Sequence, residues 1–365
     1  MDIINVRNKT THFLYKNIVK PIFFMFDPEL MHNIFIDVGA LLGSNKLTKS
    51  ITSLFFNYQS PILEQNISSL KFRNPVGLSA GFDKNGQMVS IMDDVGFGFV
   101  EIGSITAFPC AGNKGKRIER LVNRKGLWVY LGLNNFGAKA IYEKLKNKKF
   151  KIPLFVSAAK TNSKETINEY KGLQDYLFTL KTFKDRADAF VLNISCPNAF
   201  GGCDFASPSS FELLAKEVYK LKLKQPILVK ISPDLTNLNL NKIISISEKY
   251  NLSGFICTNL SKKHEFSKGG LSGKIVEKRS NEVLSYVYKK CKFSKKKFII
   301  IGVGGIFSAE DAYKKIKLGA NLVQLITGLI YEGPGLIGEI NYNLTKLLKK
   351  DGYKNIGEAV GADIR

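Results

Sequence analysis

The chain has 365 residues and a net charge of +23, from 54 Lys and Arg against 31 Asp and Glu. Hydrophobic residues make up 44% and charged residues 23%, which excludes global disorder and allows a large buried core. The lysines are scattered, so the charge predicts a lysine-rich surface, with attraction to an anionic membrane as the alternative.

The five cysteines form neither a disulfide framework nor a metal-ligand pattern with histidine, so we expect no metal site. They are Cys110, Cys196, Cys203, Cys257 and Cys291. The first 20 residues lack the pattern of an export signal, so we expect a protein of a reducing, cytoplasmic-side compartment.

Residues 1–62 form the first predicted unit, a small amphipathic helical segment. Apolar residues recur on helical spacing over residues 15–56, interrupted at Pro21 and Asp27, which predicts two or three short helices. Charged residues interrupt the run 18–42, so it contains no stretch of about 20 apolar residues that could span a bilayer. We expect these helices either to lie on a membrane or to pack onto the rest of the chain.

Residues 63–365 form the second predicted unit, a (β/α)8 TIM barrel. Eight short apolar runs alternate with helical stretches, as expected for parallel strands that are buried on both faces. A doubly wound open sheet is the alternative, and the number of strands and the placement of polar residues argue against it. The runs are residues 75–80, 99–103, 153–159, 189–194, 226–231, 254–258, 298–303 and 322–327.

Two connections between these runs, residues 104–152 and 259–297, are long. Long loops in such barrels cover the C-terminal mouth and carry function, so we expect both to form a lid.

Polar residues and glycines follow the strand ends, where barrel enzymes keep their sites. They are Gly81, Asp83, Lys84, Ser104, Lys160, Asn193, Cys196, Asn198, Lys230, Thr258, Asn259, the GVGGI sequence from Gly302, Thr327 and Gly328. The turns after the last two strands, with GGLSG at residues 269–273 as a flexible third segment, predict a cofactor that bears a phosphate.

Four asparagines near this mouth, Asn134, Asn193, Asn198 and Asn259, suit a flat ring with alternating carbonyl and NH groups. Lys84 and Lys230 would be costly to bury alone, so we expect each to face an anion or an electron-rich ring. Cys196 is a candidate base for a carbon-bound proton, and a small buried cysteine is the alternative.

From about residue 15 to residue 348 the chain resembles the dihydroorotate dehydrogenases. The motifs, in the family's order, are NPVGLSAGFDKNG, GFGFVEIGSIT, GLNNFG, NISCPN, VKISPDL, TN at residues 258–259, GGLSG, IIGVGGI and LVQLITG. The resemblance implies FMN over the barrel mouth and oxidation of dihydroorotate to orotate. In that reaction Cys196 would take the C5 proton while a hydride leaves C6 for the flavin.

The resemblance also implies binding residues. Those that match the family's FMN contacts are Ala80, Gly81, Lys84, Ser104, Asn193, Lys230, Thr258, Gly273, Gly305, Ile326 and Thr327. Those that match its substrate contacts are Lys84, Asn134, Asn193, Asn198 and Asn259.

The N-terminal segment resembles that of class 2 enzymes, whose helices form a tunnel for a membrane quinone. FDPELMHN carries this likeness, and Arg120 matches an arginine that lines the tunnel. We therefore expect a peripheral protein of the cytoplasmic side of the inner membrane, with a quinone as oxidant and no nucleic-acid partner.

Four positions depart from the class 2 pattern. Cys196 stands where class 2 enzymes have serine, as in class 1, and Tyr130, Ser157 and Leu260 replace arginine, asparagine and threonine. The alternatives are therefore a soluble class 1 enzyme that uses fumarate or NAD, another FMN barrel reductase that acts on uracil-like rings, and a non-enzymatic barrel that binds nucleic acid or membranes.

Overall fold

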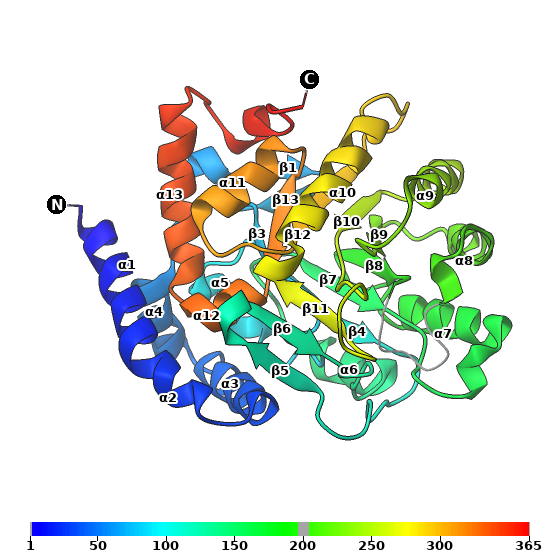
Figure 1. Cartoon of the computed structure of the whole chain (residues 1–365), viewed down its shortest axis with the longest axis horizontal. Helices are drawn as coiled ribbons and strands as arrows, with labels where there is room; N and C mark the ends of the chain where they lie inside the picture. Colours follow the sequence, from blue (N-terminus) through cyan, green and yellow to red (C-terminus); the bar gives the residue numbers. More distant parts are fainter. Residues whose placement is uncertain (1, 196–203, 365) are drawn as a thin grey trace.

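The computed structural model describes residues 2–195 and 204–364. Eight parallel strands close into one barrel in chain order, and an outer layer of helices surrounds it (Figure 1). The strands are β3 (Val76–Leu78), β4 (Phe99–Ile105), β7 (Leu154–Ala158), β8 (Ala189–Asn193), β9 (Ile227–Ile231), β10 (Gly254–Cys257), β12 (Ile299–Val303) and β13 (Leu322–Leu325). Each lies on one of the predicted runs, so the TIM barrel is confirmed and the open sheet was wrong.

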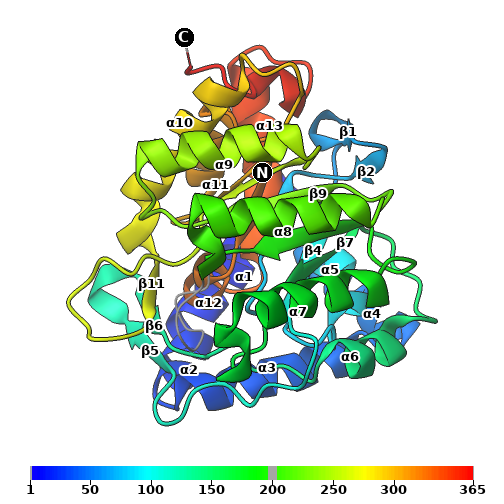
Figure 2. The same cartoon turned by 90° about the vertical axis from the view of Figure 1, so that its right-hand side faces the viewer.

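The barrel helices lie on the outside, and Figure 2 shows α7, α8 and α9 along one flank. They are α5 (Val89–Val95), α6 (Ala138–Leu145), α7 (Glu169–Thr182), α8 (Pro208–Lys220), α9 (Asn237–Lys249), α10 (Glu277–Cys291), α11 (Ala309–Lys317), the short α12 (Thr327–Glu332) and α13 (Leu336–Lys350). Because the strands pack against these helices outside and against one another inside, their residues are apolar on both faces.

A short hairpin, β1 (Gln65–Ile67) and β2 (Leu70–Phe72), closes the N-terminal end of the barrel. Phe72 packs edge-on against Phe99 at 5.5 Å between ring centroids, beside Phe155. A Cβ on Gly77 would lie 2.4 Å from the Phe99 ring, so the ring fits only against glycine. The sequence analysis did not predict this hairpin.

The two long connections meet in one antiparallel sheet beside the barrel mouth. Strands β5 (Ile118–Leu121) and β6 (Gly126–Val129) come from the first connection, and β11 (Gly270–Gly273) from the second. The predicted flexibility of GGLSG was therefore wrong, since its last four residues form a paired strand. The remainder of each connection includes an ordinary barrel helix, α6 or α10.

Helices α1 (Ile3–Leu14), α2 (Lys20–Phe24), α3 (Pro28–Leu42) and α4 (Lys46–Phe56) form the N-terminal segment, with a π-helical turn at Tyr15–Val19. Helical structure begins earlier than predicted because the Asp2 carboxylate accepts the Ile4 N–H at 3.0 Å and so caps α1. Among the described residues, no helix is both long and apolar enough to cross a membrane.

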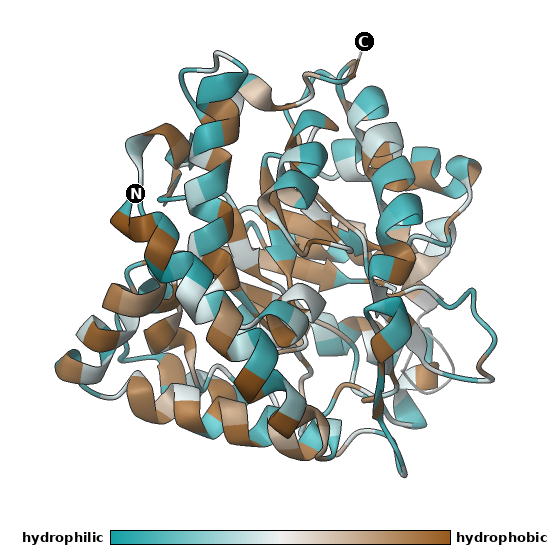
Figure 3. Cartoon of the chain, turned by 60° about the vertical axis from the view of Figure 1, so that its left-hand side comes forward, coloured by the Kyte–Doolittle hydropathy of each residue, from teal (hydrophilic) through white to brown (hydrophobic). Residues whose placement is uncertain are grey.

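This segment packs on the barrel through α5 and α13 and keeps an apolar outer side. Arg7 of α1 donates to the backbone carbonyl of Asn57 at 2.7 Å, which ties the first helix to the end of α4. Figure 3 shows hydrophobic positions recurring along the outward side of these helices. We name as the apolar outer face the exposed residues Phe13, Ile18, Ile22, Leu30, Ile34, Leu41, Leu47 and Leu54.

Candidate functional site

A cavity of about 390 Å³ lies where the barrel mouth, the β5–β6–β11 sheet and the N-terminal helices meet. It is lined by all described residues that the family resemblance assigns to the flavin, the substrate or the quinone. They are Ala80, Gly81, Lys84, Ser104, Arg120, Asn134, Asn193, Lys230, Thr258, Asn259, Gly273, Gly305, Ile326 and Thr327. Cys196 and Asn198 fall outside the described residues.

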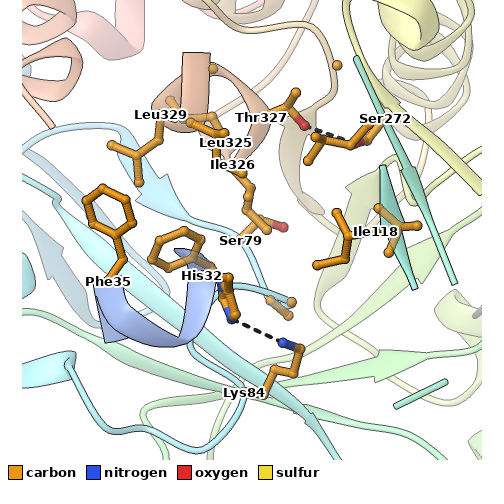
Figure 4. Close-up of a pocket in the computed structure, with 18 of the residues that line it drawn as sticks. His32, Phe35, Ser79, Lys84, Ile118, Ser272, Leu325, Ile326, Thr327 and Leu329 are labelled. Carbon is orange, nitrogen blue, oxygen red and sulfur yellow. Dashed lines mark hydrogen bonds between the residues drawn. The ribbon is translucent and has the colours of Figure 1, made fainter. Parts of the chain in front are cut away.

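The cavity has two halves of different character. The polar half consists of Ser79, Lys84, Ser104, Asn193, Lys230 and Asn259, from the barrel, and the apolar half consists of Tyr15, Phe23, Phe24, Met31 and Phe35, from the N-terminal segment. Figure 4 shows Phe35 and His32 of α3 on one side of the cavity and Ser272 and Thr327 on the other.

Lys230, at the end of β9, is held by a buried carboxylate. Its ammonium donates to Glu101 Oε2 at 3.2 Å and to Ser79 Oγ at 3.0 Å. Glu101, which is fully buried in β4, also accepts the Ala80 N–H at 3.3 Å. The expectation that Lys230 faces an anion is therefore met by the protein itself, and the pair fixes the ammonium at the cavity wall.

A chain of neutral hydrogen bonds runs across the strand ends. Asn193 Nδ2 donates to Ser104 Oγ at 2.8 Å, and Ser104 Oγ lies 2.9 Å from Ser157 Oγ. Asn259 Nδ2 donates to Asn193 Oδ1 at 3.0 Å and to Ser195 Oγ at 3.2 Å. Each amide orients the next, so the predicted ring-binding groups are preorganised.

Lys84 lies between the barrel and α3. Its ammonium is 3.2 Å from His32 Nε2, and burial lowers the pKa of Lys84 to about 8 (Figure 4). Burial, and then the nearby Lys84 charge, lower the pKa of His32 to about 3, so the imidazole is neutral and can accept from the ammonium. Lys84 is thus a cation without a contacting carboxylate in the described part of the chain, available to an anionic group in the cavity.

Glycines shape the end of the cavity formed by β11, β12 and α12. Gly273 and Gly305 have φ of +92° and +79°, and a Cβ on either would lie 2.4 Å from its nearest neighbour. Ser272 Oγ and Thr327 Oγ1 lie 2.9 Å apart beside the first turn of α12, whose amide groups have no intrahelical partner. Such a backbone-lined turn fits a phosphate group.

Two buried polar atoms of the cavity lack a hydrogen-bond partner among the described residues, Thr258 Oγ1 and Asn134 Oδ1. An unpartnered buried hydroxyl or carbonyl is costly, so both atoms fit a polar ligand in the cavity.

Arg120, on β5, marks the boundary with the apolar half. It donates to the Phe26 carbonyl at 2.7 Å, and its guanidinium lies 4.6 Å from the centre of the Phe24 ring. Burial lowers its pKa from the usual value, yet arginine remains charged. The arrangement joins the β5–β6–β11 sheet to the turn between α2 and α3.

Two residues predicted at the mouth do not line the cavity. Lys160 is buried and donates to the Thr166 carbonyl at 3.2 Å, so it closes the loop before α7. Asp83 is buried and accepts the Gln87 and Met88 N–H groups at 2.8 and 2.9 Å, so it shapes the turn before α5. Position after a strand did not decide the direction of either side chain.

The sequence analysis missed four residues of this site: Ser79, Glu101, Ser195 and His32. The sequence could have indicated Glu101, since it is a lone carboxylate inside an apolar strand and such a group must find a partner. It could also have indicated His32, because this residue interrupts the apolar run of α3.

The dihydroorotate dehydrogenase family profile matches residues 62–348. "Dihydroorotate dehydrogenase (quinone)" of Sulfurovum sp. is 39% identical and covers 94% of this chain and 97% of its own length. The protein of the same name from Trichodesmium erythraeum is 36% identical, with 95% and 98% covered.

A solved structure agrees with these relatives. The Eimeria tenella enzyme in complex with ferulenol is 29% identical, has a TM-score of 0.82 and covers 93% of this chain and 96% of its own. The ligand-free structure from that organism has a TM-score of 0.83. This chain therefore belongs to the dihydroorotate dehydrogenase family.

Proposed function

We propose that this chain oxidises dihydroorotate to orotate on a bound FMN and passes the electrons to a quinone, as a step of pyrimidine biosynthesis. Enzymes of this family use FMN, and the curated relatives named above carry the quinone name. The observation that carries the proposal is a cavity that is lined both by the described residues expected to bind flavin and substrate and by apolar side chains of the N-terminal helices.

The residues present fit FMN. Gly273, Gly305 and Thr327 would hold the phosphate, and Lys230 and Thr258 would face the ring, since Thr258 Oγ1 lacks a partner among the described residues. When bound, FMN accepts the hydride from C6 of dihydroorotate. The remaining proposed contacts are Ala80, Gly81, Lys84, Ser104, Asn193 and Ile326.

The substrate ring would lie on the amide network. Asn193 and Asn259 are already oriented by their own hydrogen bonds, and Asn134 Oδ1 is buried without a partner in the described part of the chain. Lys84 would neutralise the substrate carboxylate, since no carboxylate contacts it there. Asn198 is assigned to the substrate by the family motif alone.

Cys196 is the proposed base for the C5 proton. The assignment rests on the motif NISCPN, which follows β8 and places residue 196 directly after Ser195 of the amide network. Surroundings that lower the pKa of the thiol would place it in the thiolate form, which can accept the proton. The neutral Asn259 amide, which donates to the Ser195 carbonyl at 3.2 Å, would hold the start of this loop.

The apolar half would admit the quinone. Aromatic side chains from α2 and α3 surround it, and Arg120 is the cation of the cavity nearest to Phe24, over whose ring it lies. A guanidinium so placed can donate a hydrogen bond to a quinone carbonyl while an apolar tail lies among the rings.

The apolar outer face is the proposed membrane contact, at the cytoplasmic side of the inner membrane. Isolated apolar residues on a surface need no explanation, but eight large exposed apolar side chains on neighbouring helices indicate a binding surface. Lys9, Lys16 and Lys46 are exposed on the same helices and would face anionic headgroups.

Comparison of oxidants tests the proposal. Steady-state oxidation of dihydroorotate should be rapid with a ubiquinone analogue and slow with fumarate or NAD. Turnover with fumarate and none with quinone would refute quinone reduction. Activity on dihydrouracil with none on dihydroorotate would instead indicate a reductase of uracil-like rings.

A further inference from the structure

A lysine lies buried behind the glycine turn that follows β12. Lys315 of α11 is 1% exposed, and its ammonium donates to Asn281 Oδ1 at 2.7 Å and to Ser280 Oγ at 3.0 Å, both on α10. No ion pair joins it to a carboxylate in the described part of the chain. A buried ammonium held only by neutral oxygens is destabilising unless another negative charge is near.

The contacts of Lys315 lead to the turn itself. Ser280 Oγ donates to the Val303 carbonyl and would lie 3.1 Å from a Cβ on Gly304. A Cβ on Gly302 would lie 3.1 Å from Lys315 Cδ, so the lysine stem packs against the strand end. The ammonium is therefore joined to the turn at residues 302–305 by one hydroxyl.

The same Val303 carbonyl also accepts the Thr258 N–H at 3.2 Å. Val303, Gly304, Gly305 and Thr258 all line the cavity on its glycine-rich side. Lys315 does not line the cavity. Any effect of Lys315 on a ligand there would pass through the turn or through the electrostatic field of its ammonium.

We propose that Lys315 is a positioning residue for the phosphate of FMN, a buried cation that holds the Gly304–Gly305 turn through Ser280 and attracts the phosphate from behind it. A doubly charged phosphate at this turn would add negative charge near an ammonium that makes no ion pair with a carboxylate in the described part of the chain. The lysine thus favours phosphorylated flavin over flavin without a phosphate.

The charges around Lys315 allow this coupling. Burial lowers the pKa of Lys315 to about 7. The carboxylates of Glu277 on α10 and Asp311 on α11 oppose this lowering, and the ammonium of Lys274 adds to it. Glu277 and Asp311 are themselves bound by Lys274, at 2.9 and 2.6 Å. Near pH 7.5 part of the free protein therefore carries a neutral Lys315, and phosphate binding draws a proton onto it.

Affinity for two flavins tests the proposal. Apoprotein of the full chain is titrated with FMN and with riboflavin, following quenching of flavin fluorescence. Lys315→Met should weaken FMN about tenfold, the effect of one pKa unit of coupling, and change riboflavin less than about twofold. Lys314→Met, an exposed neighbour on α11, is the matched control and should change neither. Equal loss of both flavins, or no loss, would overturn the proposal.

Calorimetry on the parent protein provides a second test, independent of whether the variant folds. At pH 7.5, in two buffers of different ionisation enthalpy, FMN binding should take up more protons than riboflavin binding. The difference isolates the phosphate, because Lys84, whose pKa is about 8, meets the flavin in both cases. Equal uptake for the two flavins would also overturn the proposal.

Discussion

The two halves of the cavity are built in opposite ways. In the polar half, strand ends bring together side chains that already bind one another, such as Lys230 with Glu101 and Asn193 with Asn259. In the apolar half, Phe23 and Phe35 pack edge-on at 5.1 Å, and few polar contacts fix their positions. The helices that carry them expose further apolar residues on their outer side.

The difference indicates a division of labour. Hydride and proton transfer require groups held in fixed directions, which a barrel mouth provides. The proposed hydrophobic oxidant would arrive from a membrane and would require an apolar passage, which the short helices lying on the barrel would provide. Changes in the polar half should therefore affect flavin and substrate. Changes in the exposed or aromatic residues of the N-terminal segment should affect the oxidant and the membrane, whereas His32 of α3 contacts Lys84 and belongs with the polar half.

The largest effect is expected at Cys196. Cys196→Ala should retain flavin and slow its reduction by dihydroorotate by about 10²- to 10⁴-fold, because the C5 proton loses its base. Cys196→Ser should be intermediate. Rapid-mixing absorbance measures both rates. An alanine variant reduced as fast as the parent would place the base elsewhere.

Removal of Glu101 should destabilise the polar half itself. Glu101→Ala leaves Lys230 buried without its carboxylate, which should lower the free energy of unfolding by about 3–5 kcal/mol and weaken flavin retention. Glu282→Ala, which removes an exposed partner of Arg279, is the control and should cost less than about 1 kcal/mol.

Denaturant unfolding measures the free energy of unfolding of the two variants, and the flavin content of the purified proteins measures flavin retention. Equal stability of the Glu101 and Glu282 variants would show that the buried pair does not support the mouth.

A change on the apolar outer face should separate membrane binding from chemistry. Leu41→Asp places a charge at a side chain that is 68% exposed on α3 and should weaken binding to anionic vesicles about tenfold. Dihydroorotate oxidation with a soluble dye should not change. Phe293→Asp, at a side chain past α10 that is 85% exposed and lies outside the apolar outer face, is the control for vesicle sedimentation and should bind like the parent. Loss of sedimentation in both variants would contradict a specific face.

The smallest effect is expected at Thr258. Thr258→Val removes a hydroxyl that has no partner among the described residues, so the stability of the flavin-free protein should not fall. FMN affinity should fall several-fold, because one hydrogen bond of about 1 kcal/mol is lost. Thermal unfolding checks the stability of the flavin-free protein, and a flavin titration checks the affinity for FMN. A destabilised flavin-free variant would mean that the hydroxyl serves the fold.

The barrel could be predicted because strands buried on both faces appear as continuous apolar runs, and each run was placed correctly. Most polar residues of the cavity could be predicted because family motifs keep them in order near the strand ends, whereas Ser79 and His32 were missed. Lys160 and Asp83 occupy similar positions in the sequence, yet local hydrogen bonds turn them away from the cavity.

Contacts between distant segments could not be predicted. Strand β11 pairs with β6, and Trp128 Nε1 donates to the Lys268 carbonyl at 2.7 Å across 140 residues of chain. The pairing of His32 with Lys84 and of Glu101 with Lys230 likewise depends on how elements meet in space. Helical periodicity over residues 15–56 identified α2, α3 and α4 but missed α1, which lies before residue 15 and is capped by Asp2.

Anaerobic reduction of the flavin tests most directly that the polar half is built for this reaction. Purified protein carrying FMN is mixed with dihydroorotate in the absence of oxygen, and the flavin absorbance is followed. We expect the yellow band to bleach with one dihydroorotate consumed and one orotate formed for each flavin. A flavin that binds but stays oxidised with dihydroorotate would contradict the assigned chemistry.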